Sequence, residues 1–95
     1  MNRSELVQQL ASKAGISRAD AQRTVEALFD VNNGIIPEAL KRGDKVQITG
    51  FGSFETRRRE ARTGRNPRTG KEIQIEASTS AAFRAGKGLK DFIGS

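Results

Sequence analysis

The sequence predicts an α+β fold in one small domain of 95 residues. Apolar residues recur at helical spacing up to residue 44, and they alternate at strand spacing between residues 45 and 83. A basic segment rich in glycine, with one proline, interrupts that alternation and predicts the tip of a β-ribbon. We therefore expect a helical part at 1–44, a three-stranded antiparallel sheet at 45–83 with an arm at about 56–74, and a C-terminal helix at 84–95.

Two helices that form a hairpin are expected before residue 30. Asn2 caps the first, with Glu5 three residues on, and Gly15 ends it. Ser17 caps the second, with Asp20 in its first turn. The two apolar stripes are Leu6, Val7, Leu10, Ala11 and Ala14 in the first helix, and Ala21, Val25, Leu28 and Phe29 in the second.

The second helix runs into residues 32–37, which include types that are unfavourable in helix interiors. Pro37 cannot donate a hydrogen bond to the carbonyl of Asn33, and Gly34 weakens the helix further. The spacing from Leu28 to Ile35 is about two turns, so helical phase also allows a continuous helix. We favour a break, followed by a short helix at about 37–42.

The three strands are expected at 45–49, from 51 into the arginines, and at 71–83. The apolar residues before the glycines have even numbers (Val46 and Ile48), whereas Phe51 has an odd number. This shift in the alternation predicts a turn or bulge at glycines 50 and 52. The third strand alternates, with one face formed by Ile73, Ile75, Ala77, Thr79, Ala81 and Phe83. Gly64 and Gly70 are expected to shape the tip. The distal arm has almost no large apolar side chains, so we expect it to protrude.

The chain should close with a helix at 84–93. Its apolar face would consist of Ala85, Leu89, Phe92 and Ile93. Three cations, Arg84, Lys87 and Lys90, fall on the opposite side, where they form either a solvated face or a contact for an anion. Arg3, near the N-terminus of the first helix, lies against the helix dipole, which favours an external anion as its partner.

The excess charge of the chain is confined to residues 57–71. This segment has seven cations and one anion, whereas the rest of the chain holds ten of each and is neutral. With a pI of about 10.5, this concentration indicates a polyanionic partner, with nucleic acid ahead of an anionic membrane surface. Arginines on a two-stranded arm suit the DNA minor groove, and Pro67 either shapes the turn or wedges between base pairs.

Catalysis and cofactor binding are not expected. The sequence contains no Cys, His or Tyr, and its carboxylates form no pair suited to acid–base or metal chemistry. No apolar run has the length of a transmembrane helix or the form of a signal peptide, so we expect a cytoplasmic, nucleoid-associated protein. Without disulfides or metals, a core this small indicates an oligomer.

Three segments resemble the bacterial HU family of histone-like DNA-binding proteins, related to integration host factor. They are residues 50–54 (GFGSF), 61–71 (ARTGRNPRTGK) and 83–91 (FRAGKGLKD). The resemblance covers essentially the whole chain, and the tip is more similar to HU than to integration host factor. The segment at 32–37 departs from the family pattern, with about four extra residues, roughly one helical turn.

The resemblance implies an intertwined homodimer whose two arms bend duplex DNA in the minor groove, an established property of this family. Pro67 would be the wedge at each tip, and Phe51, Phe54 and Phe83 would form the dimer core. The remaining DNA-facing residues would be Arg57, Arg59, Arg62, Arg65, Asn66, Arg68 and Lys71 on the arm, and Arg3, Arg84, Lys87 and Lys90 on the body. A site-specific bender of the integration-host-factor type and, more remotely, an RNA-binding module are the alternatives. No small-molecule substrate is implied.

Overall fold

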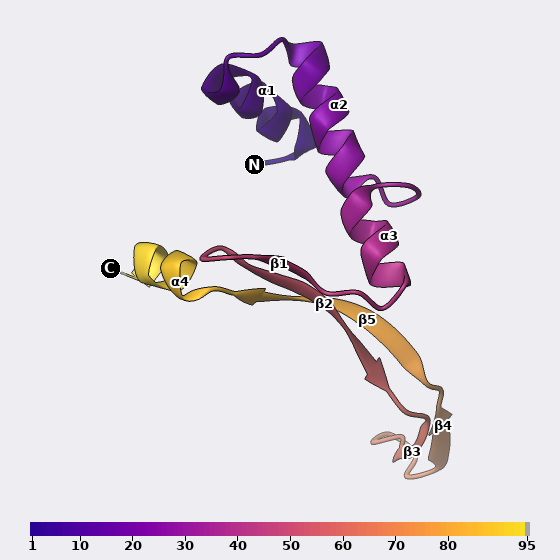
Figure 1. Cartoon of the computed structure of the whole chain (residues 1–95). Coiled ribbons are helices and arrows are strands. Elements are labelled where there is room, and N and C mark those ends of the chain that lie inside the picture. The colour runs from indigo at the N-terminus through magenta and orange to yellow at the C-terminus, as the bar shows by residue number, and fades with distance from the viewer. Residues whose placement is uncertain (95) are drawn as a thin grey trace. The chain divides into compact units, whose positions relative to one another are not determined.

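The computed structural model describes residues 1–94 and divides the chain into two compact units, Met1–Arg42 and Gly43–Ser95. The first unit is entirely helical, and the second contains all the strands and one further helix (Figure 1). The combination confirms the predicted α+β class. Ser95, the last residue of the expected C-terminal segment at 84–95, lies outside the described residues.

The helical unit begins with α1 (Arg3–Ala14) and α2 (Arg18–Phe29). The backbone N–H of Glu5 donates to Asn2 Oδ1 at 2.9 Å, and that of Asp20 donates to Ser17 Oγ at 3.0 Å. Each cap satisfies one of the backbone donors that a helix N-terminus leaves free. Both predicted caps are therefore confirmed, and α1 ends at Gly15 in the left-handed conformation, with φ of 69°.

The core of this unit is small. Val7, Ala21 and Val25 are buried, and Leu10 and Ala11 pack against them. Several large apolar side chains remain exposed on the same unit, namely Leu6, Ile16, Phe29, Val31 and Ile35. The helical hairpin therefore leaves much of its apolar surface in contact with solvent.

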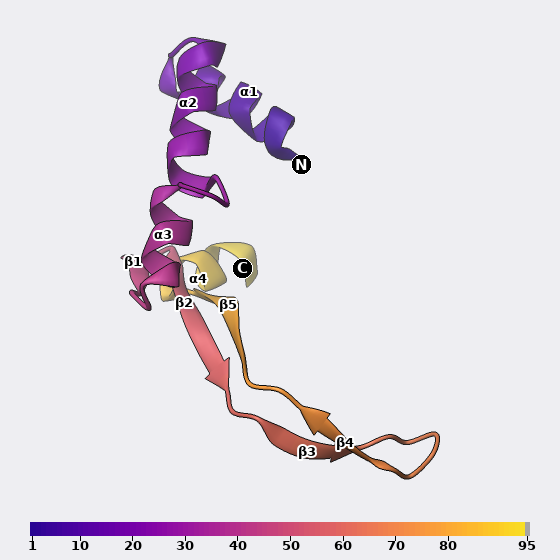
Figure 2. The ribbon, with the colours of Figure 1, turned by 90° about the vertical axis from the view of Figure 1, so that its right-hand side faces the viewer.

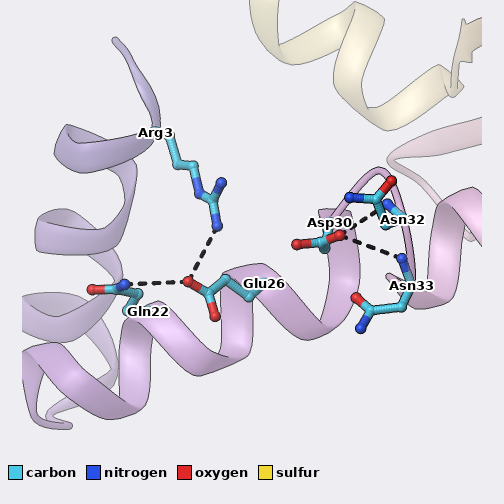
Figure 3. A network of polar contacts seen from close by, with 6 residues as sticks. All are labelled: Arg3, Gln22, Glu26, Asp30, Asn32 and Asn33. Carbon is cyan, nitrogen blue, oxygen red and sulfur yellow. Dashed lines mark hydrogen bonds and ion pairs between the residues drawn. The ribbon is translucent and has the colours of Figure 1, made fainter.

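An Asx turn separates α2 from α3 (Ile35–Lys41). Asp30 Oδ1 accepts hydrogen bonds from the backbone N–H groups of Asn32 at 2.8 Å and Asn33 at 3.3 Å (Figure 3). The N–H of Gly34 donates to the Asp30 carbonyl at 2.7 Å. The favoured break is present, but α3 starts at residue 35 rather than 37. Pro37 thus falls in the first turn of α3, where its missing N–H removes no helical bond.

The second unit is built on an antiparallel sheet in the order β1-β2-β5, formed by β1 (Val46–Ile48), β2 (Gly52–Arg59) and β5 (Ser78–Ala85). The expected turn between the first two strands lies at residues 49–51, where the N–H of Phe51 donates to the Ile48 carbonyl at 3.0 Å. Gly50 adopts a φ of 85°, a conformation that suits glycine.

The arm is a separate two-stranded ribbon of β3 (Arg62–Arg65) and β4 (Glu72–Ile75), which extends beyond the sheet (Figure 2). The expectation of two uninterrupted strands is wrong, because pairing stops at 60–61 and at 76–77. Each gap contains one glutamate and one alanine, residue types that are depleted in strands. Each of the two strands has two unpaired residues at this point, so the register is the same before and after the interruption.

The C-terminal helix α4 spans Lys87–Gly94 and does not include Arg84, in contrast to the prediction. Arg84 lies in β5 opposite Ser53, because pairing with β2 continues to Ala85. The chain then changes direction at Gly86, whose N–H donates to the Phe51 carbonyl at 2.8 Å. Arg84, Lys87 and Lys90 therefore do not share one helical face.

We expect Gly34→Ala to destabilise the protein. A Cβ at this position would lie 2.6 Å from the Asp30 nitrogen and 2.7 Å from its oxygen, both backbone atoms that cannot move without breaking the turn. Overpacking of this kind lowers the free energy of unfolding by about 1–3 kcal/mol. Urea denaturation at fixed protein concentration measures this change in the free energy of unfolding.

Gly94→Ala is the matched control, because a Cβ there meets nothing within 4 Å. Equal unfolding midpoints for the Gly34→Ala variant and the unmodified protein would contradict the role assigned to this turn.

Candidate nucleic-acid interface

The register of β2 and β5 separates the basic residues of the arm base onto two faces. Arg57 lies directly opposite Ser80, and Arg59 lies opposite Ser78. Because side chains alternate along a strand, these four residues share one face of the sheet. Arg58 belongs to the other face, which further along carries the paired rings of Phe54 and Phe83. Of the three consecutive arginines, two therefore point away from the aromatic cluster.

Glu55 brings together two of the predicted DNA-facing residues. Its Oε1 atom lies 3.8 Å from Arg57 Nη2 and 3.8 Å from Arg84 Nε. The Glu55 side chain is 24% exposed, whereas both arginines are more than half exposed. Such long, solvated ion pairs contribute little stability, but they hold two cations from adjacent strands beside each other. Sequence reasoning missed Glu55, which becomes visible only once the β2–β5 register is known.

The tip is a hydrogen-bonded loop organised by Asn66. The Asn66 N–H donates to the Lys71 carbonyl at 2.9 Å, and its own carbonyl accepts from Gly70 at 2.8 Å. The side-chain Oδ1 accepts from the Arg68 N–H at 2.8 Å. Gly70 has a φ of 71°, so it shapes the turn as expected. Pro67 and Arg68 lie exposed at the apex of this loop.

Gly64 has a different role from the one expected of it. It lies within β3, and its φ falls outside the left-handed region. A Cβ there would lie 2.7 Å from Ile75 Cδ1, so Gly64 leaves space for an isoleucine across the ribbon. Ile73 is 44% exposed on the same ribbon. The distal arm therefore carries two large apolar side chains, both on β4.

The remaining predicted contacts are exposed cations. On the arm these are Arg62, Arg65, Arg68 and Lys71. Lys87 forms an ion pair with Asp91 at 2.9 Å within α4, and Lys90 is exposed on the same helix.

Arg3 belongs to the helical unit, where it forms an ion pair with another residue of the same unit. Arg3 Nη2 lies 3.3 Å from Glu26 Oε1, which also accepts a hydrogen bond from Gln22 Nε2 at 3.2 Å (Figure 3). Both side chains are exposed, at 60% and 42%, so this solvated pair contributes little stability. An anion that binds Arg3 would have to compete with Glu26.

Residues 1–94 contain no group of three or more Asp or Glu residues placed to hold a metal ion. In the same part of the chain, no helix is both long and apolar enough to cross a membrane.

A family model described as bacterial DNA-binding protein matches residues 1–94. The chain belongs to this family. The resemblance to HU is thereby confirmed, and curated HU proteins agree with it. The chain is 52% identical over 93 residues to HU of Geobacillus stearothermophilus, covering 98% of this chain and 99% of that protein. It is 50% identical to HU 1 of Bacillus subtilis, with 98% and 97% covered.

Solved HU structures share the fold. A cocrystal structure of Anabaena HU with DNA matches with a TM-score of 0.82 and 42% identity, covering 98% of this chain and 97% of that one. HU of Thermotoga maritima matches with a TM-score of 0.64 and 31% identity, with 98% of each chain covered. The match to both extends over the helices, the sheet and the arm, since almost the whole chain is aligned.

We expect Asn66→Ala to loosen the tip loop. The variant removes the acceptor of the Arg68 N–H, a bond that stabilises the loop by about 0.5–1.5 kcal/mol. The temperature coefficient of the Arg68 amide proton in NMR spectra should become that of a solvent-bonded amide. Asn66→Asp keeps the Oδ1 acceptor and should keep the native coefficient. An unchanged coefficient in the alanine variant would show that Asn66 does not organise the loop.

Proposed function

We propose that this HU-family protein is a nucleoid-associated architectural protein that binds duplex DNA with little sequence specificity, bends it and compacts it. The observation that carries the proposal is the position of the charge. The whole net charge of +6 lies on residues 57–71, and these residues form the end of β2, the β3 strand and the exposed tip. A narrow ribbon with cations on an exposed surface fits a DNA groove better than a flat surface does.

The arm residues divide into two roles in this proposal. Arginines and Lys71 along the ribbon neutralise phosphates and enter the minor groove, where the negative potential is enhanced. Pro67 is apolar, lacks an N–H and lies exposed at the apex, and these properties support a role in inserting between base pairs. The tip hydrogen bonds of Asn66 hold the proline in this position.

A second copy of the chain completes the protein in this proposal. Phe83 contacts Phe51 and Phe54, with ring centroids 5.5 and 5.0 Å apart, yet Phe51 is 47% and Phe83 44% exposed. Phe92 and Ile93 on α4 are more exposed still. Aromatic surface of this extent is normally covered, and a homodimer would cover it while presenting two arms to one duplex.

The RNA-binding alternative gains no support from the arm. Sequence-specific RNA recognition relies on bases stacked on aromatic side chains, and residues 57–76 contain no aromatic residue. A site-specific bender remains distinguishable by experiment, because it would prefer one duplex sequence over others.

Binding to duplex DNA should weaken steeply as salt concentration rises. Log K should fall against log[salt] with a slope of roughly −0.9 per phosphate neutralised, because each contact releases a counterion from the duplex. Fluorescence anisotropy at several salt concentrations measures the slope. Random duplex, nicked duplex, a candidate integration-host-factor site and RNA should be compared at one salt concentration.

Salt-insensitive binding would refute the electrostatic mechanism. Preference for RNA would favour the RNA-binding alternative, and strong preference for one duplex would favour the site-specific bender.

Pro67→Ala should reduce DNA bending more than DNA binding. The substitution removes the wedge but leaves every cation of the arm in place, so affinity should change by less than about threefold. Ring closure of short DNA fragments by ligase reports bending, and anisotropy reports binding.

Arg65→Ala provides the contrast, since it removes one phosphate contact and should mainly weaken binding. Unchanged ring closure with Pro67→Ala would rule out the wedge.

A further inference from the structure

We propose that Ser78 and Ser80 are further DNA-contacting residues, whose hydroxyl groups donate hydrogen bonds to backbone phosphates beside Arg57 and Arg59. The proposal rests on the proposed function and extends it to a surface that charge alone does not reveal. The strip consists of Arg57, Arg59, Ser78, Ser80 and Arg84, and we call it the phosphate face.

The pairing of β2 with β5 defines this face. Ser80 is the direct cross-strand neighbour of Arg57, and Ser78 is that of Arg59. Directly opposed residues on an antiparallel pair have Cβ atoms about 4.5–5.5 Å apart and project to the same side. Each hydroxyl therefore lies next to one guanidinium group, and a phosphate that binds the arginine is within reach of the serine.

The ion pairs of Glu55 independently confirm how the side chains are arranged. Arg84 is two residues from Ala82, which pairs with Glu55, and Arg57 is two residues from Glu55 along β2. Both arginines reach the same carboxylate oxygen. Contact from both strands shows that Glu55, Arg57 and Arg84 lie on one face, and Ser80 and Ser78 continue that face toward the arm.

The opposite face is occupied by other contacts. Phe54 and Phe83 pack on it at a ring-centroid distance of 5.0 Å, and Thr79 lies opposite Arg58 further along it. Arg58 Nε is 3.3 Å from Glu60 Oε1. The aromatic rings make the face of Thr79 less suited to phosphate than the face of Ser78 and Ser80.

Hydroxyl groups suit these two positions for an electrostatic reason. A lysine or arginine directly opposite Arg57 or Arg59 would place like charges together, which weakens the pairing without abolishing it. Serine supplies a hydrogen-bond donor without that repulsion, and serine is a common donor to phosphate oxygens. Both serines are exposed, and within residues 1–94 no side-chain hydrogen bond occupies either hydroxyl.

The test compares adjacent residues on opposite faces of β5. Ser80→Asp and Thr79→Asp make the same change in net charge, one residue apart, in the same strand. We expect Ser80→Asp to raise the Kd for random duplex DNA about tenfold and Thr79→Asp only about twofold, because short-range repulsion acts on the phosphate face and salt screens the other. Ser78→Asp should resemble Ser80→Asp.

A second pair keeps the test decisive if aspartate disturbs the strand. Ser80→Lys should tighten binding and steepen the salt slope by about 0.9, as one added phosphate contact would, whereas Thr79→Lys should do so less. Thermal unfolding identifies the variants that fold.

The proposal would be overturned if, among variants that fold, substitutions at Thr79 changed the Kd or the salt slope as much as the same substitutions at Ser80, or more. Failure of the proposed function would look different, since the unmodified protein would then show no salt-dependent binding to duplex DNA.

Discussion

The antiparallel pairing between β2 and β5 is the constraint on which the rest of the second unit depends. Its register runs from Gly52 opposite Ala85 to Arg59 opposite Ser78 and resumes unchanged in the arm. Because strand side chains have a period of two, a slip of one residue would exchange the two faces completely. The same pairing thus keeps the aromatic rings on one side and gathers Arg57 and Arg84 around Glu55 on the other.

Glycines permit the close backbone approach that this register requires. A Cβ on Gly52 would lie 2.5 Å from the Arg84 carbonyl oxygen and 2.7 Å from the Phe83 ring. A Cβ on Gly86 would lie 2.9 Å from the backbone of Gly50, next to the point where α4 begins. The tip is shaped differently. Hydrogen bonds of Asn66 and the left-handed conformation of Gly70 shape it without close packing.

Local signals in the sequence were sufficient for the helix caps, the break before α3 and the three-stranded sheet. They failed where a long-range contact overrides a local pattern. Arg84 reads as helical from its spacing to Lys87 and Lys90, but pairing with Ser53 keeps it in β5. The sequence suggests that Gly64 is a turn residue, but it lies in a strand, where the absence of a Cβ leaves space for Ile75 across the ribbon. The pairing of Arg3 with Glu26 and of Arg84 with Glu55 depends on the fold, so no sequence spacing could identify these partners.

The confinement of all net charge to one segment has a kinetic consequence. The remainder of the chain carries no net charge, so the charge distribution of the chain is polar, with its positive end on the ribbon. In the field of a polyanion, such a distribution experiences a torque as well as an attraction while the partners are still separated by solvent. The molecule would arrive ribbon first, and fewer random orientations would have to be sampled at encounter. Fast capture would then follow from where the cations are placed rather than from how many there are.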